Sequence, residues 1–220
     1  MAERIYEESS YAARNSIYQE LLCRAYRQAG KLEGTRTVLL VGVGGQGTIL
    51  AGNILAMTAA EADLDVKISE IHGMSQTGGS VSTVIRVGSH VDSMVADLGC
   101  ADAIVAFEAI EALRAWQYLK EGGTVIVNDE TIAPVSVAIG TFKMPDDVEA
   151  RLDALGAKKI NAGVIARAAG RPKSTNVVLV GTLSTMLPLD EEAWESAIRR
   201  CVPPRRLRRT SKPSVAAVLS

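Results

Sequence analysis

A glycine turn between an apolar strand and a helix is the feature that most constrains how this chain folds. Residues 37–41 are rich in Val and Leu, which is typical of a strand buried on both faces of a sheet. They lead directly into the turn Gly-Val-Gly-Gly-Gln-Gly at residues 42–47, and the apolar residues after the turn have helical spacing. The order of strand, glycine turn and helix predicts the start of an α/β domain.

The same turn is a candidate anion site. Glycines let the backbone come close to a ligand, and the first N–H groups of the helix point toward that ligand with a partial positive charge. A phosphate or pyrophosphate group is the expected occupant, held by Gly42, Gly44, Gly45, Gln46 and Gly47. The alternative is that these glycines only allow the strand and the helix to pack closely.

Further strands and helices follow along the chain. Strands are predicted over residues 66–70, 80–87, 103–107 and 124–128, and helices over residues 109–119, 146–155, 162–169, 177–186 and 190–200. Strands that alternate with helices imply a mostly parallel sheet with both faces covered. The predicted fold is α/β, a doubly wound, mostly parallel, Rossmann-like sheet with a helical C-terminal third and an N-terminal helical extension.

A second polar loop follows the second predicted strand, over residues 70–80. We expect it at the same carboxyl-end edge of the sheet as the glycine turn, so that the two loops face one cleft. Its small residues and many hydrogen-bonding groups suit a polar ligand. The binding candidates in this loop are Glu70, Ser75, Gln76, Gly78, Gly79 and Ser80.

Two residues of this loop have more specific hypotheses. Glu70 comes 23 residues after Gly47, roughly where an NAD site has its ribose-binding carboxylate. His72 is a candidate proton donor, with a loop hydrogen bond as the alternative. Ser75 lacks the G-x-S-x-G pattern of hydrolases, so hydrolytic chemistry is not indicated.

Composition excludes several classes of protein. The 220 residues and 47% hydrophobic content suffice for one compact domain, and the net charge of -1 disfavours binding to nucleic acid or an anionic membrane. We find neither a membrane-spanning apolar stretch nor a secretory signal, so we expect a cytoplasmic protein. The three cysteines, Cys23, Cys100 and Cys201, are too widely separated to form a metal or iron–sulfur site.

The two ends of the chain differ from its middle. Residues 1–34 are predicted to form a helical extension and linker, because an apolar stripe at helical spacing is followed by a short polar segment. The domain itself is expected over residues 35–204. Residues 205–220 are expected to be a basic, disordered tail.

Three ordered segments give the chain a family resemblance. Residues 38–51, 71–81 and 103–114 together resemble the beta subunit of indolepyruvate ferredoxin oxidoreductase, which is related to the gamma subunit or domain of the 2-oxoacid:ferredoxin oxidoreductases. The resemblance extends over residues 37–204 and includes Asn176. Three motifs in the same order are far more specific than a single glycine turn.

The resemblance implies a shared reaction. An aryl 2-oxoacid is decarboxylated on thiamine diphosphate, electrons pass through 4Fe-4S clusters to ferredoxin, and the acyl group goes to coenzyme A. The thiamine diphosphate and the clusters would belong to a larger alpha subunit, so the chain would be inactive alone. Both loops would line the subunit interface and contact coenzyme A.

Three alternatives remain open at this point. The chain could be the gamma subunit of another oxidoreductase, acting on pyruvate, 2-oxoglutarate or 2-oxoisovalerate. It could be a stand-alone NAD(P)-binding dehydrogenase, although its C-terminal third contains no His to act as an acid or base. It could also be a nucleotide-binding module without an activity of its own.

Overall fold

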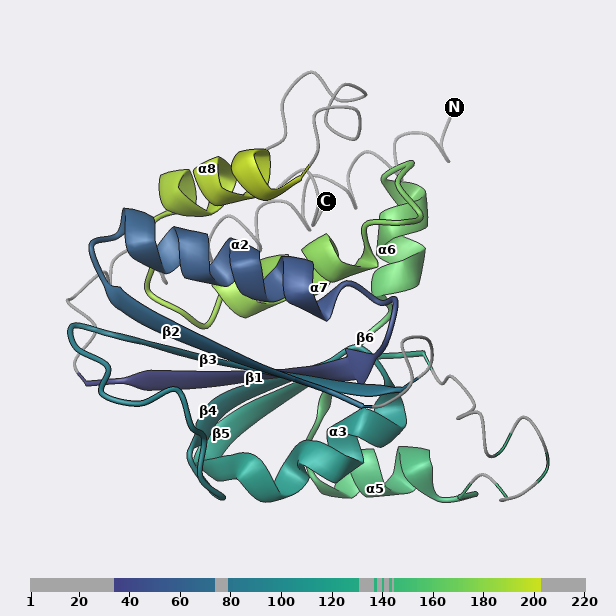
Figure 1. Ribbon diagram of the computed structural model, residues 1–220. Coiled ribbons are helices and arrows are strands. Elements are labelled where there is room, and N and C mark those ends of the chain that lie inside the picture. The colour runs from purple at the N-terminus through teal and green to yellow at the C-terminus, as the bar shows by residue number, and fades with distance from the viewer. Residues whose placement is uncertain are drawn as a thin grey trace, which may run out of the picture.

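A six-stranded sheet forms the centre of the computed structural model, which describes residues 34–73, 79–130, 137, 140, 143 and 145–202 (Figure 1). The strands are β1 (Arg36–Val43), β2 (Asp65–His72), β3 (Ser80–Gly88), β4 (Ala101–Ala106), β5 (Leu119–Asn128) and β6 (Lys158–Ile160). Their order across the sheet is β2-β3-β1-β4-β5-β6. Only β3 runs against the others, pairing antiparallel with both β1 and β2, so the predicted mostly parallel sheet is confirmed.

Helices cover both faces of this sheet (Figure 1). One face carries α2 (Thr48–Glu61), α6 (Ala162–Ala168), α7 (Thr175–Ser184) and α8 (Glu191–Cys201), and the other carries α3 (Ala109–Ala115) and α5 (Val148–Ala154). Successive strand residues point to opposite faces, so Val38 and Leu40 enter one core while Leu39 and Val41 enter the other. The doubly wound arrangement and the helical C-terminal third are therefore confirmed.

The structure corrects the predicted helix over residues 109–119. Helix α3 ends at Ala115, a 3-10 turn spans Trp116–Tyr118, and β5 begins at Leu119, which pairs with Ala101 of β4. Pairing with a neighbouring strand outweighs the helical spacing of these residues, because the spacing reflects only local sequence. The short strand β6 was not predicted, since three residues carry too little pattern to be recognised.

The connection between β2 and β3 contains no helix, as predicted from the loop between the strands over residues 66–70 and 80–87, and it makes this part of the sheet antiparallel. These strands are antiparallel neighbours joined by residues 73–79, too few for a crossover helix. The sheet therefore has one helix fewer to cover it near β2.

Several predictions fall outside the described residues. These are the N-terminal extension, the tail, and the positions of Cys23, Ser75, Gln76 and Gly78. Within the described ranges, the helices are too short or too polar to cross a bilayer.

Candidate functional site

The candidate site lies at the carboxyl-end edge of the sheet, where β1 and β4 lie side by side. The chain leaves β1 into α2 on one face and leaves β4 toward α3 on the other face (Figure 1). Such a switch point opens a crevice outside the strand ends, which is where α/β sheets bind their ligands. The glycine turn meets the described ends of the second loop, residues 70–73 and 79–80, at this edge, and we call the glycine turn and residues 70–80 together the two-loop site.

Gln46 holds the glycine turn in shape. Its Oε1 accepts a hydrogen bond from the Val43 N–H at 2.8 Å, and its Nε2 donates to the Phe107 carbonyl oxygen at 3.0 Å. A methyl group at Gly42 would lie 2.7 Å from Gln46 Oε1 and 2.9 Å from Phe107 Cβ. Gly42 and Gln46 therefore serve the close packing of β1 against the segment after β4. The same methyl group would lie 3.2 Å from Thr48 Cγ2 of α2, which agrees with the alternative that the glycines allow the strand and the helix to pack closely.

Gly45 and Gly47 open the amino end of α2. Both have positive φ, at 101° and 85°, a backbone region that favours glycine. Gly47 is the N-cap of α2 and no side chain caps the helix within the described residues. The first N–H groups of an α-helix have no acceptor inside the helix, so here they are available to an anion.

The structure brings the two predicted loops together. The Gly44 N–H donates to the Gly79 carbonyl oxygen at 2.8 Å, and Val43 lies opposite Ser80 in the β1–β3 pairing. A further hydrogen bond, from the Gly73 N–H to the Ser80 carbonyl oxygen at 2.8 Å, closes the base of the second loop. The expectation that both loops lie at one edge is confirmed.

Glu70 does not lie where an NAD site needs its carboxylate. Strand β3 separates β2 from β1, so Glu70 is two strand spacings, about 9.6 Å, from the strand that carries the glycine turn. Its carboxylate instead lies beside the His72 imidazole, with 3.4 Å between Oε2 and Nε2. This geometry gives no support to the dinucleotide hypothesis for Glu70.

Two buried carboxylates at the same edge were missed by sequence reasoning. Glu108 caps α3, accepting hydrogen bonds from the N–H groups of Ile110 at 2.8 Å and Glu111 at 3.0 Å. Glu111 itself is only 5% exposed. An acidic residue directly after an apolar strand is a helix-start signal that could have identified Glu108.

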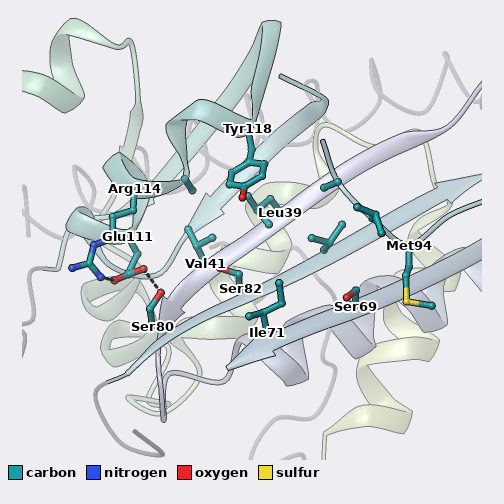
Figure 2. Close-up of a pocket in the computed structure, with 14 residues that line it drawn as sticks. Leu39, Val41, Ser69, Ile71, Ser80, Ser82, Met94, Glu111, Arg114 and Tyr118 are labelled. Atoms are coloured by element: carbon teal, nitrogen blue, oxygen red, sulfur yellow. Dashed lines mark hydrogen bonds and ion pairs between the residues drawn. The ribbon is translucent and has the colours of Figure 1, made fainter. Parts of the chain in front are cut away.

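Glu111 joins the second loop to α3. Ser80 Oγ donates to Glu111 Oε2 at 2.6 Å, and Arg114 donates to Glu111 Oε1 at 2.7 Å. Figure 2 shows these three side chains at one end of a hollow on the sheet face. No sequence pattern pairs Ser80 with Glu111, because 31 residues separate them in the chain.

Two asparagines complete this edge. Asn128, at the end of β5, donates to the Phe107 carbonyl oxygen at 3.3 Å and accepts from the Ala162 N–H at 3.1 Å. Asn176 lies against the turn, with its Nδ2 3.5 Å from the Gly47 carbonyl oxygen. These contacts fix α6 and α7 relative to the strand ends.

The described residues contain no group of three or more side chains suited to hold a metal ion. Cys100 and Cys201 are free thiols. Burial, with a smaller contribution from the charge of Glu61, raises the pKa of the Cys201 thiol above its ordinary value and so disfavours the reactive thiolate. The chemistry that this edge offers is therefore backbone and side-chain hydrogen bonding to a polar or anionic ligand.

Sequence comparisons agree with the motifs. The family described as pyruvate ferredoxin/flavodoxin oxidoreductase matches residues 37–217. The indolepyruvate oxidoreductase subunit IorB of Thermococcus kodakarensis is 41% identical over 175 residues, which cover 76% of this chain and 87% of the relative. The subunit of the same name from Archaeoglobus fulgidus is 40% identical over 168 residues, covering 74% of this chain and 83% of the relative.

Solved structures share the fold. The pyruvate oxidoreductase subunit PORC of Thermotoga maritima superposes with a TM-score of 0.61 at 20% identity, covering 85% of this chain and 94% of that chain. The 2-oxoglutarate:ferredoxin oxidoreductase of Magnetococcus marinus superposes with a TM-score of 0.56 at 18% identity, and the match covers 85% of this chain and 29% of that chain. The resemblance inferred from the three motifs is confirmed, and the chain belongs to the pyruvate ferredoxin/flavodoxin oxidoreductase family.

Proposed function

We propose that this chain is the non-cluster subunit of an indolepyruvate, or arylpyruvate, ferredoxin oxidoreductase. The observation that carries the proposal is the 41% identity to an indolepyruvate oxidoreductase subunit over 87% of that subunit's length. In the reaction, the bond between C1 and C2 of the aryl 2-oxoacid breaks and releases CO2. A thioester forms between C2 and the coenzyme A sulfur, the thiol proton is released, and two electrons pass to ferredoxin.

The thiamine diphosphate and 4Fe-4S clusters belong, in this proposal, to the larger alpha subunit. The residues described in this chain do not fit a cluster, because they contain no suitable group of metal ligands. The contribution of this chain is a polar wall that binds and orients, while the partner carries out the oxidation.

The two-loop site is proposed to contact coenzyme A through its phosphate groups. The uncapped N–H groups of α2 supply the donors, Gly45 has open space where a side chain would lie, and Gly44 and Gly79 join the loops. Ser75, Gln76, Gly78 and Ser80 would add hydroxyl, amide and backbone contacts from the second loop, and His72 remains a candidate proton donor there.

A charge placed at the start of α2 tests this contact. Ile49 is exposed in the first turn of α2, so Ile49→Glu leaves the core intact. The new carboxylate interacts favourably with the helix dipole, but it repels a bound phosphate. In the assembled enzyme we expect KM for coenzyme A to rise about tenfold with kcat unchanged. The neutral variant Ile49→Gln is the control, and equal KM values in both variants would exclude phosphate binding at this helix.

The central experiment is anaerobic co-purification of this chain with the cluster-containing large subunit. Coenzyme A-dependent reduction of ferredoxin is then measured with indolepyruvate, phenylpyruvate and pyruvate. We expect activity with the aryl substrates from the complex and none from either chain alone. Pyruvate as the preferred substrate would favour the alternative of a general 2-oxoacid gamma subunit, which the 27% identity to a pyruvate/ketoisovalerate common gamma subunit keeps open.

Location and domain limits complete the proposal. We propose a cytoplasmic protein in which residues 35–204 form the subunit's domain, with residues 1–34 as an extension and residues 205–220 as a basic tail. The family match supports the start of this domain and reaches residue 217.

Tight NAD binding by the isolated chain, without complex formation, would instead favour the dehydrogenase alternative.

A further inference from the structure

One face of the sheet is only partly covered by the helices of the described residues. On that face α3 contacts β1, β4 and β5 and packs against α5, whereas the helix in contact with β2 and β3 is α2, on the opposite face (Figure 1). The cause is the direct connection from β2 to β3, which supplies no crossover helix. A doubly wound sheet normally buries both faces, so this bare area is a departure from the expected packing.

The uncovered area is apolar and hollowed. A cavity of about 220 Å³ lies over Leu39, Val41 and Val84 and is open to solvent. Its border carries Ile71 on β2, which is 65% exposed, and Val95 after β3, which is 64% exposed. We call this area the β2–β3 face.

Exposed apolar side chains are concentrated at this face. Six large apolar side chains are exposed among the described residues, and Ile71, Met94 and Val95 border this one cavity. Leu98 is also exposed and follows in the same segment after β3, although it is not one of the residues that line the cavity. Contiguous exposed apolar surface of this kind marks an interaction site more often than scattered single residues do.

The segment that carries Met94 and Val95 is held in place. Arg86 donates hydrogen bonds to the carbonyl oxygens of Ser93 at 3.0 Å and Val95 at 3.3 Å. At the opposite end, the buried Glu111 fixes Arg114 beside the cavity (Figure 2). An apolar centre with Met, Tyr118 and Arg at its border has the residue composition of a protein–protein interface.

We propose that the larger subunit of the oxidoreductase docks on the β2–β3 face with an apolar surface that fills the cavity. The inference rests on the proposed function. In the Magnetococcus marinus protein the matching unit is 29% of one longer chain, so it is covalently joined to the rest of that chain. A separate subunit such as this one has to be held to its partner by non-covalent contacts. The net charge of -1 provides little long-range attraction, so apolar contact has to stabilise the complex.

The position of the face supports this occupant over others. The cavity reaches Ser80, whose neighbour Gly79 is hydrogen-bonded to Gly44 of the glycine turn. A subunit seated on the β2–β3 face would therefore extend directly to the two-loop site. This contact places the partner beside the groups that the proposed function assigns to coenzyme A.

Charged substitutions at exposed positions test the docking surface. Ile71→Asp and Val95→Asp should each weaken the affinity for the purified large subunit about tenfold or more, because a charge would be buried in an apolar contact. The melting temperature of the isolated chain should stay unchanged, since both side chains are already exposed. The matched control is Val164→Asp on α6, 49% exposed on the other side of the sheet, which should bind within twofold of wild type.

The outcomes separate this inference from the proposed function. If the wild-type chain does not bind the large subunit, the proposed function fails. If the wild type binds and Ile71→Asp and Val95→Asp bind equally well, the proposed function stands and the docking surface is wrong. If these variants only dissociate a homodimer of the chain, a second copy occupies the face and the inference is likewise overturned. Hydrogen exchange should slow in residues 91–98 on complex formation, and unchanged exchange there would contradict the inference.

Discussion

Two positions of the glycine turn require glycine for different reasons. At Gly42 the reason is space, because Gln46 and Phe107 occupy the volume that a side chain would need. At Gly47 a positive φ of 85° is combined with the close approach of Asn176. A sequence pattern shows only that glycine recurs, whereas the structure shows which property of glycine each position requires.

Gly47→Ala should destabilise the domain by about 2 to 4 kcal/mol. The added methyl group would lie 2.6 Å from Asn176 Nδ2, in addition to the cost of a positive φ. The measurement is urea unfolding, with Gly170→Ala as control, because Gly170 has φ of 70° and open space around it. Asn176→Ala in the Gly47→Ala background should recover part of the loss, and a cost equal to that of Gly170→Ala would contradict the steric argument.

Asp102 ties together three strands at the opposite edge of the sheet. It accepts hydrogen bonds from the Thr37 N–H at 2.9 Å, from Arg36 at 3.0 Å and from Lys120 at 2.6 Å. Burial acts to raise the pKa of the Asp102 carboxyl, but these three donors together outweigh burial and hold the pKa below its ordinary value of 3.8.

Asp102→Asn should therefore lower stability in a pH-dependent way. The folded-state pKa is depressed, so the carboxylate stabilises the fold fully above the unfolded-state value near 3.8 and loses this effect as the pH falls through the lower folded-state value. We expect a loss of about 1 to 2 kcal/mol at pH 7 and a smaller difference from wild type at pH 3. Urea unfolding at both pH values tests this, with the exposed Asp92→Asn as control. If the stability difference between wild type and Asp102→Asn is the same at both pH values, the charge of the Asp102 carboxylate does not stabilise the fold.

At the scale of elements, a side-chain hydrogen bond links strand β3 to helix α3. The Ser80 hydroxyl donates to the nearly buried Glu111, which also receives Arg114. A buried carboxylate is costly unless its oxygens are hydrogen-bonded, so each donor matters to both elements. The Ser80–Glu111 hydrogen bond also fixes the end of the second loop, because Ser80 is the residue at which that loop ends and β3 begins.

Ser80→Ala should destabilise the domain by about 1 to 3 kcal/mol, since it leaves one oxygen of Glu111 without its donor. Ser82→Ala is the matched control, two residues along the same strand and lining the same cavity, with no side-chain hydrogen bond among the described residues. Chemical denaturation of both variants gives the comparison. Equal stability of the two would show that the Ser80 hydroxyl is dispensable.

Elements with strong local patterns were predicted correctly, whereas the start of β5 and the short strand β6, which depend on pairing with a neighbouring strand, were not. The strand, turn and helix over residues 36–61 have apolar runs and glycines that specify them locally. Residues 116–119 read as the end of the helix predicted over residues 109–119, and residues 124–128 read as a strand, yet β5 already begins at Leu119, which pairs with Ala101. Pairing partners come from distant sequence, so no local window contains the information.

At the scale of the whole molecule, the domain has two cores separated by one sheet. The larger core, under α2, α7 and α8, includes α7 residues that are buried on nearly all sides. The smaller core lies under α3 and α5 and stops at the β2–β3 face. Among the described residues, the sheet is therefore covered along its full width on one side, whereas on the other side exposed apolar side chains border the cavity over β2 and β3.

Leu179→Ala should cost about 2 to 5 kcal/mol, because this fully buried side chain of α7 would leave a cavity in the larger core. Global unfolding in urea measures the effect. The exposed Val164→Ala should change stability by less than about 0.5 kcal/mol. Similar losses for the two variants would mean that α7 does not form part of a single cooperative core.

The sequence by itself determined the α/β class, the glycine turn, the position of the second loop and the family, because these depend on local spacing and on ordered motifs. The tertiary structure alone decided that β3 lies between β1 and β2, which moves Glu70 away from the turn. It also brought Ser80 to Glu111 and, among the described residues, left the β2–β3 face without a covering helix. The physical reason is that strand order and burial arise from contacts between residues far apart in the chain, and these contacts leave no local pattern in the sequence.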